Sequence, residues 1–390
     1  MNRLDNLIHE FCPHGVVHTR IADISTVLRG KRLTKNELTI AGAFPVFHGG
    51  LEPLGFYSQK NREADTTMVI NVGASAGTVG FCERDFWSSD GCFCISHSEH
   101  ALSKYVYYVL VNQQSFLMSK VRKAGIPTLD AKVVENLQIP LPPLAVQQEI
   151  VRILDSFTEL TAELTAELTS ELTARRKQYE HYRDELLTFG DDVPMVPLGE
   201  ICNVQAGGTP SKKEKQYWTD GTIKWLGSTV CQNQKTVDSV TDYITELGLE
   251  KSSARIMPKD ATLIALVGAT IGKVAFLPFE AAINQNIAGV YPKHPDKVNP
   301  SYVYYACTML YPEFIGISQG KLALANLSFV RGLKIPLPSI EVQEHTAAIL
   351  DRFDAICNDL TSGLPAEITA RQKQYEYYRD KLLTFKELER

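Results

Sequence analysis

Apolar residues recur at spacings of three, four and seven along two long stretches of the chain, residues 139–189 and 335–385. Such spacing gathers apolar side chains on one face of an α-helix. In the first stretch they are Ile150, Ile153, Leu154, Phe157, Leu160, Leu164, Leu168, Leu172, Tyr179, Tyr182, Leu186 and Phe189. In the second they are Ile349, Leu350, Phe353, Ile356, Leu360, Leu364, Ile368, Tyr375, Tyr378, Leu382 and Phe385. Each stretch predicts a long helix that needs a partner for its apolar face.

The two stretches are copies of one another. At a constant offset of 196 and without a gap, 28 of their 51 positions are identical. Two equivalent helices pack most simply antiparallel around a pseudo-two-fold axis, and we expect the globular segments at opposite ends of that pair. Gly363 and Pro365 predict a kink or break in the second helix.

The repeat divides the chain into four segments. We predict globular domains over residues 1–138 and 196–334, and helical spacers over residues 139–195 and 335–390. Runs of β-branched residues at 68–72 and 262–267 predict strands among turns and short helices, which indicates an α+β fold. Landmarks recur in both globular segments, since Gly73–Phe81 parallels Gly268–Phe276 and Tyr105–Tyr108 parallels Tyr302–Tyr305. The polar loops between these landmarks differ, which suits two modules that recognise different things.

A run of four-residue units, TELTAELTAELTSEL, occupies residues 158–172 of the first helix. Four residues advance an α-helix by about 400°, so each leucine is displaced by about 40° from the last. One unit changes the helix length by ~6 Å. Units can therefore be gained or lost while the apolar face stays roughly in register, and we expect this run to act as a ruler.

Charge is divided between the segments of this 390-residue chain, whose formal net charge is -5. The globular segments carry +1 and +3, and the helical segments carry -6 and -3. A polyanion is therefore expected to bind the globular segments.

The sequence shows neither a signal peptide nor a membrane span, so we expect a cytoplasmic protein without a membrane partner. The eight cysteines form no CxxC pair and are expected to be reduced thiols.

The candidate DNA contacts are basic and amide-bearing side chains in the loops that differ between the globular segments. Arginine and lysine suit phosphates and guanine edges, whereas asparagine and glutamine suit adenine. In the first segment they are Arg29, Lys31, Arg32, Lys35, Asn36, Lys60 and Arg62. In the second they are Thr209, Ser211, Lys212, Lys213, Lys215, Lys224, Gln232, Asn233 and Lys235. For any one of them, a solvated charged loop remains the alternative.

Three catalytic or metal-binding motifs are only approximated. Gly268–Lys273 is one residue short of a phosphate-binding loop, and a tight turn between strands explains its glycines. Asn299–Tyr302 resembles a methyltransferase motif but lacks its second proline, and the repeat favours a helix start capped by Ser301. Cys82, Cys92, Cys94, His97 and His100 do not have a common zinc spacing. We therefore predict no catalytic residue and no metal site in this chain.

Taken whole, the chain resembles a specificity subunit of a type I restriction-modification system. The resemblance covers essentially the full length. It is carried by three features: the paired IPLPP and IPLPS entries, each followed two residues later by VQ, at 139–147 and 335–343; the two KQYE-containing tails; and the TAEL units at 161–168. It implies two target-recognition domains, each reading one half of a bipartite, asymmetric site on double-stranded DNA. The two antiparallel helices would form the spacer that sets the gap between the half-sites.

The resemblance also implies partners and a division of labour. Methyltransferase subunits, two by expectation, would dock on the helices and domains and bring S-adenosylmethionine. Restriction subunits would join them and use ATP and magnesium, while this chain binds no cofactor and performs no chemistry. Two alternatives stay open: a DNA amino-methyltransferase that acts alone, and a scaffold whose modules bridge proteins rather than read DNA.

Overall fold

The computed structural model describes residues 3–237, 239–317, 324–358 and 363–388. By its internal contacts the chain forms two compact units. The first unit comprises Met1–Ala166 with Thr369–Arg390, and the second comprises Glu167–Ile368. Each unit combines a globular α+β part with portions of the long helices. No helix in the described part of the chain has the length and apolar character that a membrane span requires.

The first unit is built around two small sheets and a strand pair. Strands β2 (Val27–Arg29), β8 (Cys92–Ile95), β5 (Thr66–Ile70) and β6 (Val79–Cys82) lie in that order in an antiparallel sheet. Strands β4 (Gly55–Tyr57), β3 (Phe44–Phe47) and β7 (Trp87–Ser88) form the second sheet, in which β3 and β7 are parallel. Strands β1 (His18–Arg20) and β9 (Gln138–Pro140) pair antiparallel.

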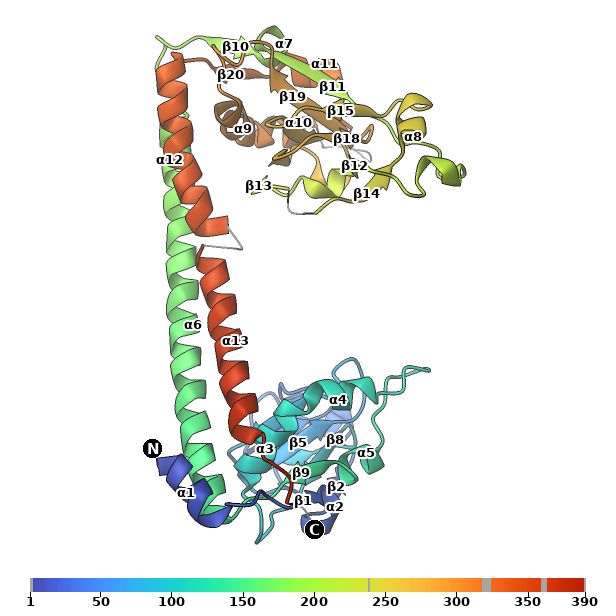
Figure 1. The fold of residues 1–390 in the computed structure, drawn as a ribbon, viewed down its shortest axis with the longest axis vertical. Helices are drawn as coiled ribbons and strands as arrows, with labels where there is room; N and C mark the ends of the chain where they lie inside the picture. The colour runs from blue at the N-terminus through green and yellow to red at the C-terminus, as the bar shows by residue number, and fades with distance from the viewer. Residues whose placement is uncertain (1–2, 238, 318–323, 359–362, 389–390) are drawn as a thin grey trace. The chain divides into compact units, whose positions relative to one another are not determined.

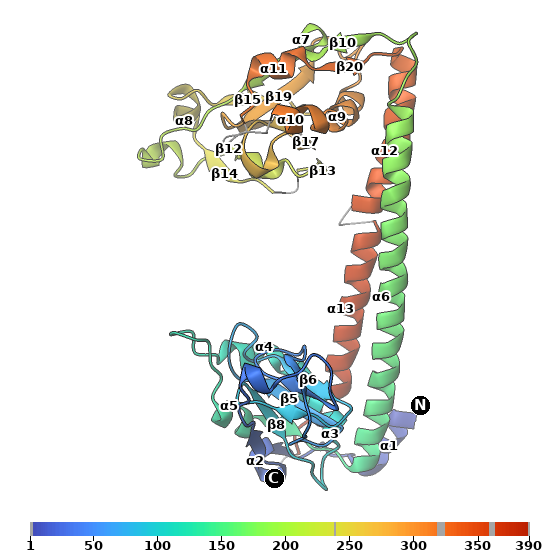
Figure 2. The same ribbon diagram turned by 180° about the vertical axis from the view of Figure 1, so that it is seen from behind.

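Helices cover these sheets in the first unit, with α3 lying against β5 and β6 (Figure 2). Tyr105, Val109 and Leu110 of α3 are buried because their faces pack onto the sheet. The helical elements are α1 (Arg3–Phe11), α2 (Ile21–Ile24), the 3-10 turn η1 (Lys35–Glu37), α3 (Ser103–Asn112), α4 (Gln114–Ser119) and α5 (Ala131–Glu135).

The second unit repeats this design with one strand added to each sheet. Its larger sheet has the order β11 (Cys202–Ala206), β19 (Ile287–Pro292), β16 (Thr262–Ala265), β17 (Val274–Phe276) and β13 (Gln234–Thr236). The other has the order β14 (Asp242–Ile244), β12 (Ile223–Leu226), β18 (Ala281–Ile283) and β15 (Arg255–Met257), with β12 and β18 parallel. Strands β10 (Met195–Pro197) and β20 (Lys334–Pro336) pair antiparallel as β1 and β9 do.

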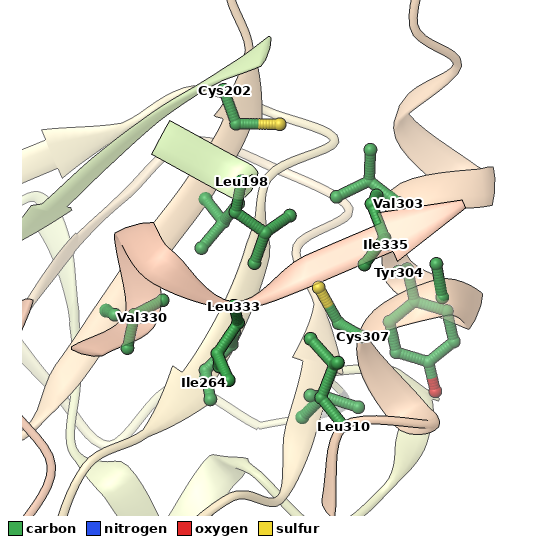
Figure 3. Packing of buried hydrophobic residues seen from close by; sticks show 14 of the residues in the cluster. Leu198, Cys202, Ile264, Val303, Tyr304, Cys307, Leu310, Val330, Leu333 and Ile335 are labelled. Carbon is green, nitrogen blue, oxygen red and sulfur yellow. The ribbon is translucent and has the colours of Figure 1, made fainter. Parts of the chain in front are cut away.

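Short helices complete the second unit, and side chains from several of them meet in one core. Figure 3 shows Leu198, Ile264, Val303, Val330 and Ile335 gathered from five different elements, all of them fully buried. The helical elements are α7 (Leu198–Ile201), η2 (Lys215–Tyr217), η3 (Ser228–Val230), α8 (Glu246–Glu250), η4 (Gly268–Thr270), α9 (Pro300–Thr308), α10 (Tyr311–Ile317) and α11 (Leu327–Gly332).

The glycines of the approximate phosphate-loop motif form tight turns, as predicted. Gly268 and Gly272 lie between β16 and β17 with φ of 71° and 75°, and Gly73 and Gly77 lie between β5 and β6 with φ of 91° and 92°. A side chain at Gly272 would meet the ring of Phe314, and glycine is the residue that accepts such a φ without strain. The equivalent turns in the two units therefore need glycine because their backbone adopts a positive φ.

Helix α6 (Leu144–Leu186) contributes its first part to the first unit and the remainder to the second (Figure 1). In the first unit its Phe157 ring lies 6.0 Å from the ring of Tyr378, and Thr158 Oγ1 lies 3.0 Å from Tyr375 Oη. Both partners belong to α13 (Leu364–Leu383). Numbers rise along α6 while they fall along α13, so the two helices are antiparallel there.

Within the second unit, α6 runs antiparallel to α12 (Ile340–Asn358). The ring of Tyr182 stacks on that of Phe353 at 5.3 Å, and Tyr179 lies near the carboxylate of Asp354. Gly363 is a bend outside any helix, and Pro365 lies in the first turn of α13. The second copy is therefore not one continuous helix, which confirms the break predicted from Gly363 and Pro365.

Two expectations about the helices need correction. The leucines of the TAEL run do not share one buried face, since Leu160 is 60% exposed and Leu168 is 8% exposed. The displacement of about 40° per unit accounts for the difference, because it carries successive leucines around the helix. At α9 the cap is Asn299, whose side chain accepts a hydrogen bond from Tyr302 N, and not Ser301.

Candidate nucleic-acid interface

The first candidate loop leaves strand β2 and is held by its backbone. Lys31 N donates to Ser88 O at 2.9 Å, and Trp87 Nε1 donates to Lys31 O at 2.7 Å. The side chains of Lys31, Arg32 and Asn36 are exposed, and the side chain of Lys35 lies outside what the structure describes. This loop therefore combines a fixed path with cationic and amide groups that point to solvent.

Two further candidates in the first unit are engaged inside the domain. Lys60 Nζ contacts Asp85 at 2.7 Å and Glu63 at 2.8 Å, and these hydrogen bonds raise the pKa of Lys60. The guanidinium of Arg62 donates to Arg29 O at 2.8 Å and to Asn61 O at 2.6 Å. Arg62 thus holds the backbone at Arg29, and Lys60 is held by two carboxylates of its own domain.

The candidate loop of the second unit folds around Trp218. Trp218 Nε1 donates to Ser211 O at 3.2 Å, and Lys212 Nζ lies 5.7 Å from the centre of the Trp218 ring. Thr209 Oγ1 donates to Gln285 Oε1 at 2.7 Å. Lys213 and Lys215 are exposed, and no ion-pair partner is found for either among the residues that the structure describes.

Three of the remaining candidates support the second unit's own structure. Lys224 Nζ lies 3.8 Å from the centre of the Phe279 ring. Asn233 adopts a φ of 60° directly before β13, and its side chain accepts a hydrogen bond from Val274 N at 3.0 Å, which ties the start of β13 to the start of β17. Gln232 is exposed and donates to Thr229 O at 2.9 Å.

Lys235 is placed against the long helix α12. Its ammonium contacts the Asp351 carboxylate, donates to Ser301 Oγ at 2.5 Å, and lies 5.1 Å from the ring centres of Phe276 and Tyr305. Only 16% of its side chain is exposed. The sequence offered it as a DNA contact, and the structure gives it an ion pair within the second unit.

The anchors that hold each globular part to its helix escaped the sequence analysis. Gln147 and Gln343, both fully buried, are equivalent residues near the starts of α6 and α12. Gln147 donates to Pro142 O and His100 O and accepts from Leu102 N, and Gln343 repeats this with Pro338, Lys297 and Asn299. The sequence feature that marks these two glutamines is the VQ pair shared by both copies of the repeat.

The soft-ligand cluster considered for zinc is a set of core thiols. Cys82, Cys92 and Cys94 are buried among apolar side chains. The Cys92 and Cys94 thiols share a hydrogen bond, which lowers the pKa of Cys94 and raises that of Cys92. In the described part of the chain, no group of three or more histidine, cysteine or acidic side chains is arranged to hold a metal ion.

Comparison with a family model and with known proteins indicates the same family each time. A family model for the type I restriction modification DNA specificity domain matches residues 13–174 and again residues 190–370. A type I restriction enzyme specificity subunit of Escherichia coli is 38% identical over 297 residues, which cover 73% of this chain and 71% of that protein. A putative type I specificity subunit of Haemophilus influenzae is 29% identical over 380 residues, which cover 92% of each chain.

Solved structures share the fold. A chain from a study of complex assembly in a type I restriction-modification system covers 96% of this chain and 98% of its own length, with a TM-score of 0.67 and 17% identity. The crystal structure of a type I S subunit from M. genitalium covers 94% of this chain and 96% of its own, with a TM-score of 0.53 and 18% identity.

Proposed function

Because the chain belongs to the family of type I restriction-modification DNA specificity proteins, we propose that it directs such a complex to one bipartite DNA site. It is the component that recognises DNA and not a catalytic subunit. Each globular domain reads one short half of the site, and the helices set the gap between the halves. The relatives named above are specificity subunits, which favours this function over a methyltransferase that acts alone and over a protein-bridging scaffold.

The duplicated sheets with unlike loops carry this proposal. The strand order β2, β8, β5, β6 recurs as β11, β19, β16, β17, so both domains present loops from equivalent strand ends. One loop carries Lys31, Arg32 and Asn36, and the other carries Lys213 and Lys215 around Trp218. Equivalent frames with different polar groups suit the recognition of two different half-sites.

The remaining assignments extend the proposal to partners. Two methyltransferase subunits dock on the helices and bring S-adenosylmethionine, and restriction subunits bring the site for ATP and magnesium. This chain then binds DNA without a cofactor of its own, in the cytoplasm. The acidic character of both helical segments supports a role in contacting protein rather than DNA.

Mapping methylated DNA motifs in the host tests the proposal. A strain with the chain should carry one methylated bipartite motif, and a strain without it should lose that motif and no other. Exchanging residues 196–334 for the corresponding domain of a relative should change one half-site and leave the other intact. Methyl transfer by the purified chain alone would support the solitary methyltransferase, and an unchanged set of motifs would contradict the proposal.

A further inference from the structure

A groove of about 580 Å³ in the first unit gathers basic side chains from distant parts of the sequence. Strands β2 and β8 contribute Arg29 and Phe93 to its lining. The remaining lining comes from the segment between α4 and α5 and from α5 itself. Four cations line it, namely Arg29, Lys120, Arg122 and Lys132, against the two carboxylates Asp130 and Glu135.

The four cations are exposed and not neutralised by neighbours. No ion pair to Arg29, Lys120, Arg122 or Lys132 is found within the described ranges of the chain. Arg29 and Lys120 lie over rings instead, with the Arg29 guanidinium 5.9 Å from the Phe93 ring centre and Lys120 Nζ 5.0 Å from that of Phe116. Asp130 is committed elsewhere, because its carboxylate caps α5 by accepting from Lys132 N at 2.9 Å.

The loop that carries Arg122 has a fixed base. Arg122 and Thr128 exchange two backbone hydrogen bonds, of 2.9 and 3.1 Å. Gly73 N donates to Pro127 O and Leu129 N donates to Asn71 O, both at 2.9 Å, which ties the base to the end of β5. Residues 122–126 are all exposed, and the loop projects from the domain between α4 and α5 (Figures 1 and 2).

We propose that this groove binds the phosphate backbone of duplex DNA beside the half-site that the first domain reads. The inference rests on the proposed function and deepens it, because it separates a phosphate-binding surface from the base-reading loop. Arg29 joins the two, since it lines the groove and lies two residues before Lys31 in the chain. Unpaired cations on a fixed frame suit phosphates, which position the protein without carrying sequence information.

The test uses the full chain assembled with its methyltransferase subunits and a duplex that carries the methylated motif. Lys120→Gln, Arg122→Gln and Lys132→Gln are made singly and together, and the dissociation constant is measured over a range of salt concentrations. Each removed charge should lower the slope of log K against log salt by about 1, with the methylated motif unchanged. Arg122→Lys should keep the wild-type slope, because it retains the charge.

Arg84→Gln is the matched control, since Arg84 is an exposed cation of the same unit that lies outside the groove. It should leave the slope unchanged. Unaltered slopes in the triple variant, an altered motif, or equal losses in Arg122→Lys and Arg122→Gln would each overturn the inference. Wild-type complex that fails to bind the duplex would instead overturn the proposed function, so the two failures are distinguishable.

Discussion

Tyr305 Oη donates a hydrogen bond to Asp351 Oδ1 at 2.7 Å, which joins helix α9 of the second domain to the long helix α12. The first unit repeats the bond, because Tyr108 Oη donates to Asp155 Oδ1 at 2.6 Å. A lysine approaches each carboxylate but comes from a different element: Lys104 of α3 lies 3.3 Å from Asp155, and Lys235 of β13 contacts Asp351. The domains thus keep a common attachment to their helices while their loops differ.

This attachment should make the protein less stable at alkaline pH. Burial raises the pKa of Tyr105, Tyr108, Tyr302 and Tyr305 above the ordinary value near 10, and the bond to Asp351 adds to the rise at Tyr305. The unfolded chain then loses these protons at lower pH than the folded chain. Their contribution to stability is complete below about pH 10 and is lost as the pH rises above it.

Denaturant unfolding at about pH 8 and about pH 11 measures this effect. Tyr305→Phe should show a smaller decrease in the free energy of unfolding between the two conditions than wild type, since one raised group has been removed. Tyr243→Phe is the control, because Tyr243 is 44% exposed. An equal decrease in wild type and Tyr305→Phe would contradict the assignment.

Gln147→Ala should destabilise the first unit strongly. The substitution leaves Leu102 N, His100 O and Pro142 O without their side-chain partner, at a position where the Gln147 side chain is fully buried. Unsatisfied buried groups cost ~1–3 kcal/mol each, so we expect a loss of about 3–5 kcal/mol in the free energy of unfolding. Gln138→Ala, at an exposed position of β9, should change it by less than about 0.5 kcal/mol. Similar values for the two variants would refute the role of Gln147.

Lys235→Gln and Lys213→Gln should separate a structural lysine from a DNA-contacting one. Lys235→Gln removes the cation from Asp351 and should reduce the free energy of unfolding by ~1 kcal/mol. Lys213→Gln should leave the free energy of unfolding unchanged. It should lower the slope of log K for DNA binding against log salt by about 1. Chemical denaturation and salt-dependent binding assays report the two effects. Unchanged stability together with a reduced salt slope in Lys235→Gln would show that Lys235 contacts DNA and does not stabilise the fold.

Deleting Thr165–Leu168 should shorten α6 by ~6 Å without interrupting the helix. With ~3.4 Å per base pair, we expect the gap between the half-sites to contract by one or two base pairs, while both half-sites stay the same. Methylation mapping in the host measures the gap and the half-sites together. Glu167→Gln keeps the helix length and should keep the gap. A changed half-site in the deletion variant would refute the ruler.

Sequence periodicity and repetition predicted a good part of this architecture, because both are local properties of the chain. The apolar spacing identified the long helices, and Gly363 with Pro365 located the break, since neither residue continues a helix comfortably. The matching glycine turns and Tyr-Val-Tyr-Tyr segments indicated two related domains. Leu160 was misplaced because the displacement of about 40° per four-residue unit carries it off the face on which Leu168 is buried.

The candidate interface shows where the sequence stops being sufficient. Charge and loop composition selected Arg29, Lys213 and Lys235 alike, since the residue type does not reveal whether a basic side chain forms an ion pair. Only the fold brings Asp351 to Lys235, and only the fold brings Arg122 and Lys132 beside Arg29 from about a hundred residues away. The sequence by itself determined the repeat, the helices and the two related domains. Tertiary structure decided which charges are neutralised and which have no ion-pair partner among the described residues, because ion pairing depends on distance in space and not along the chain.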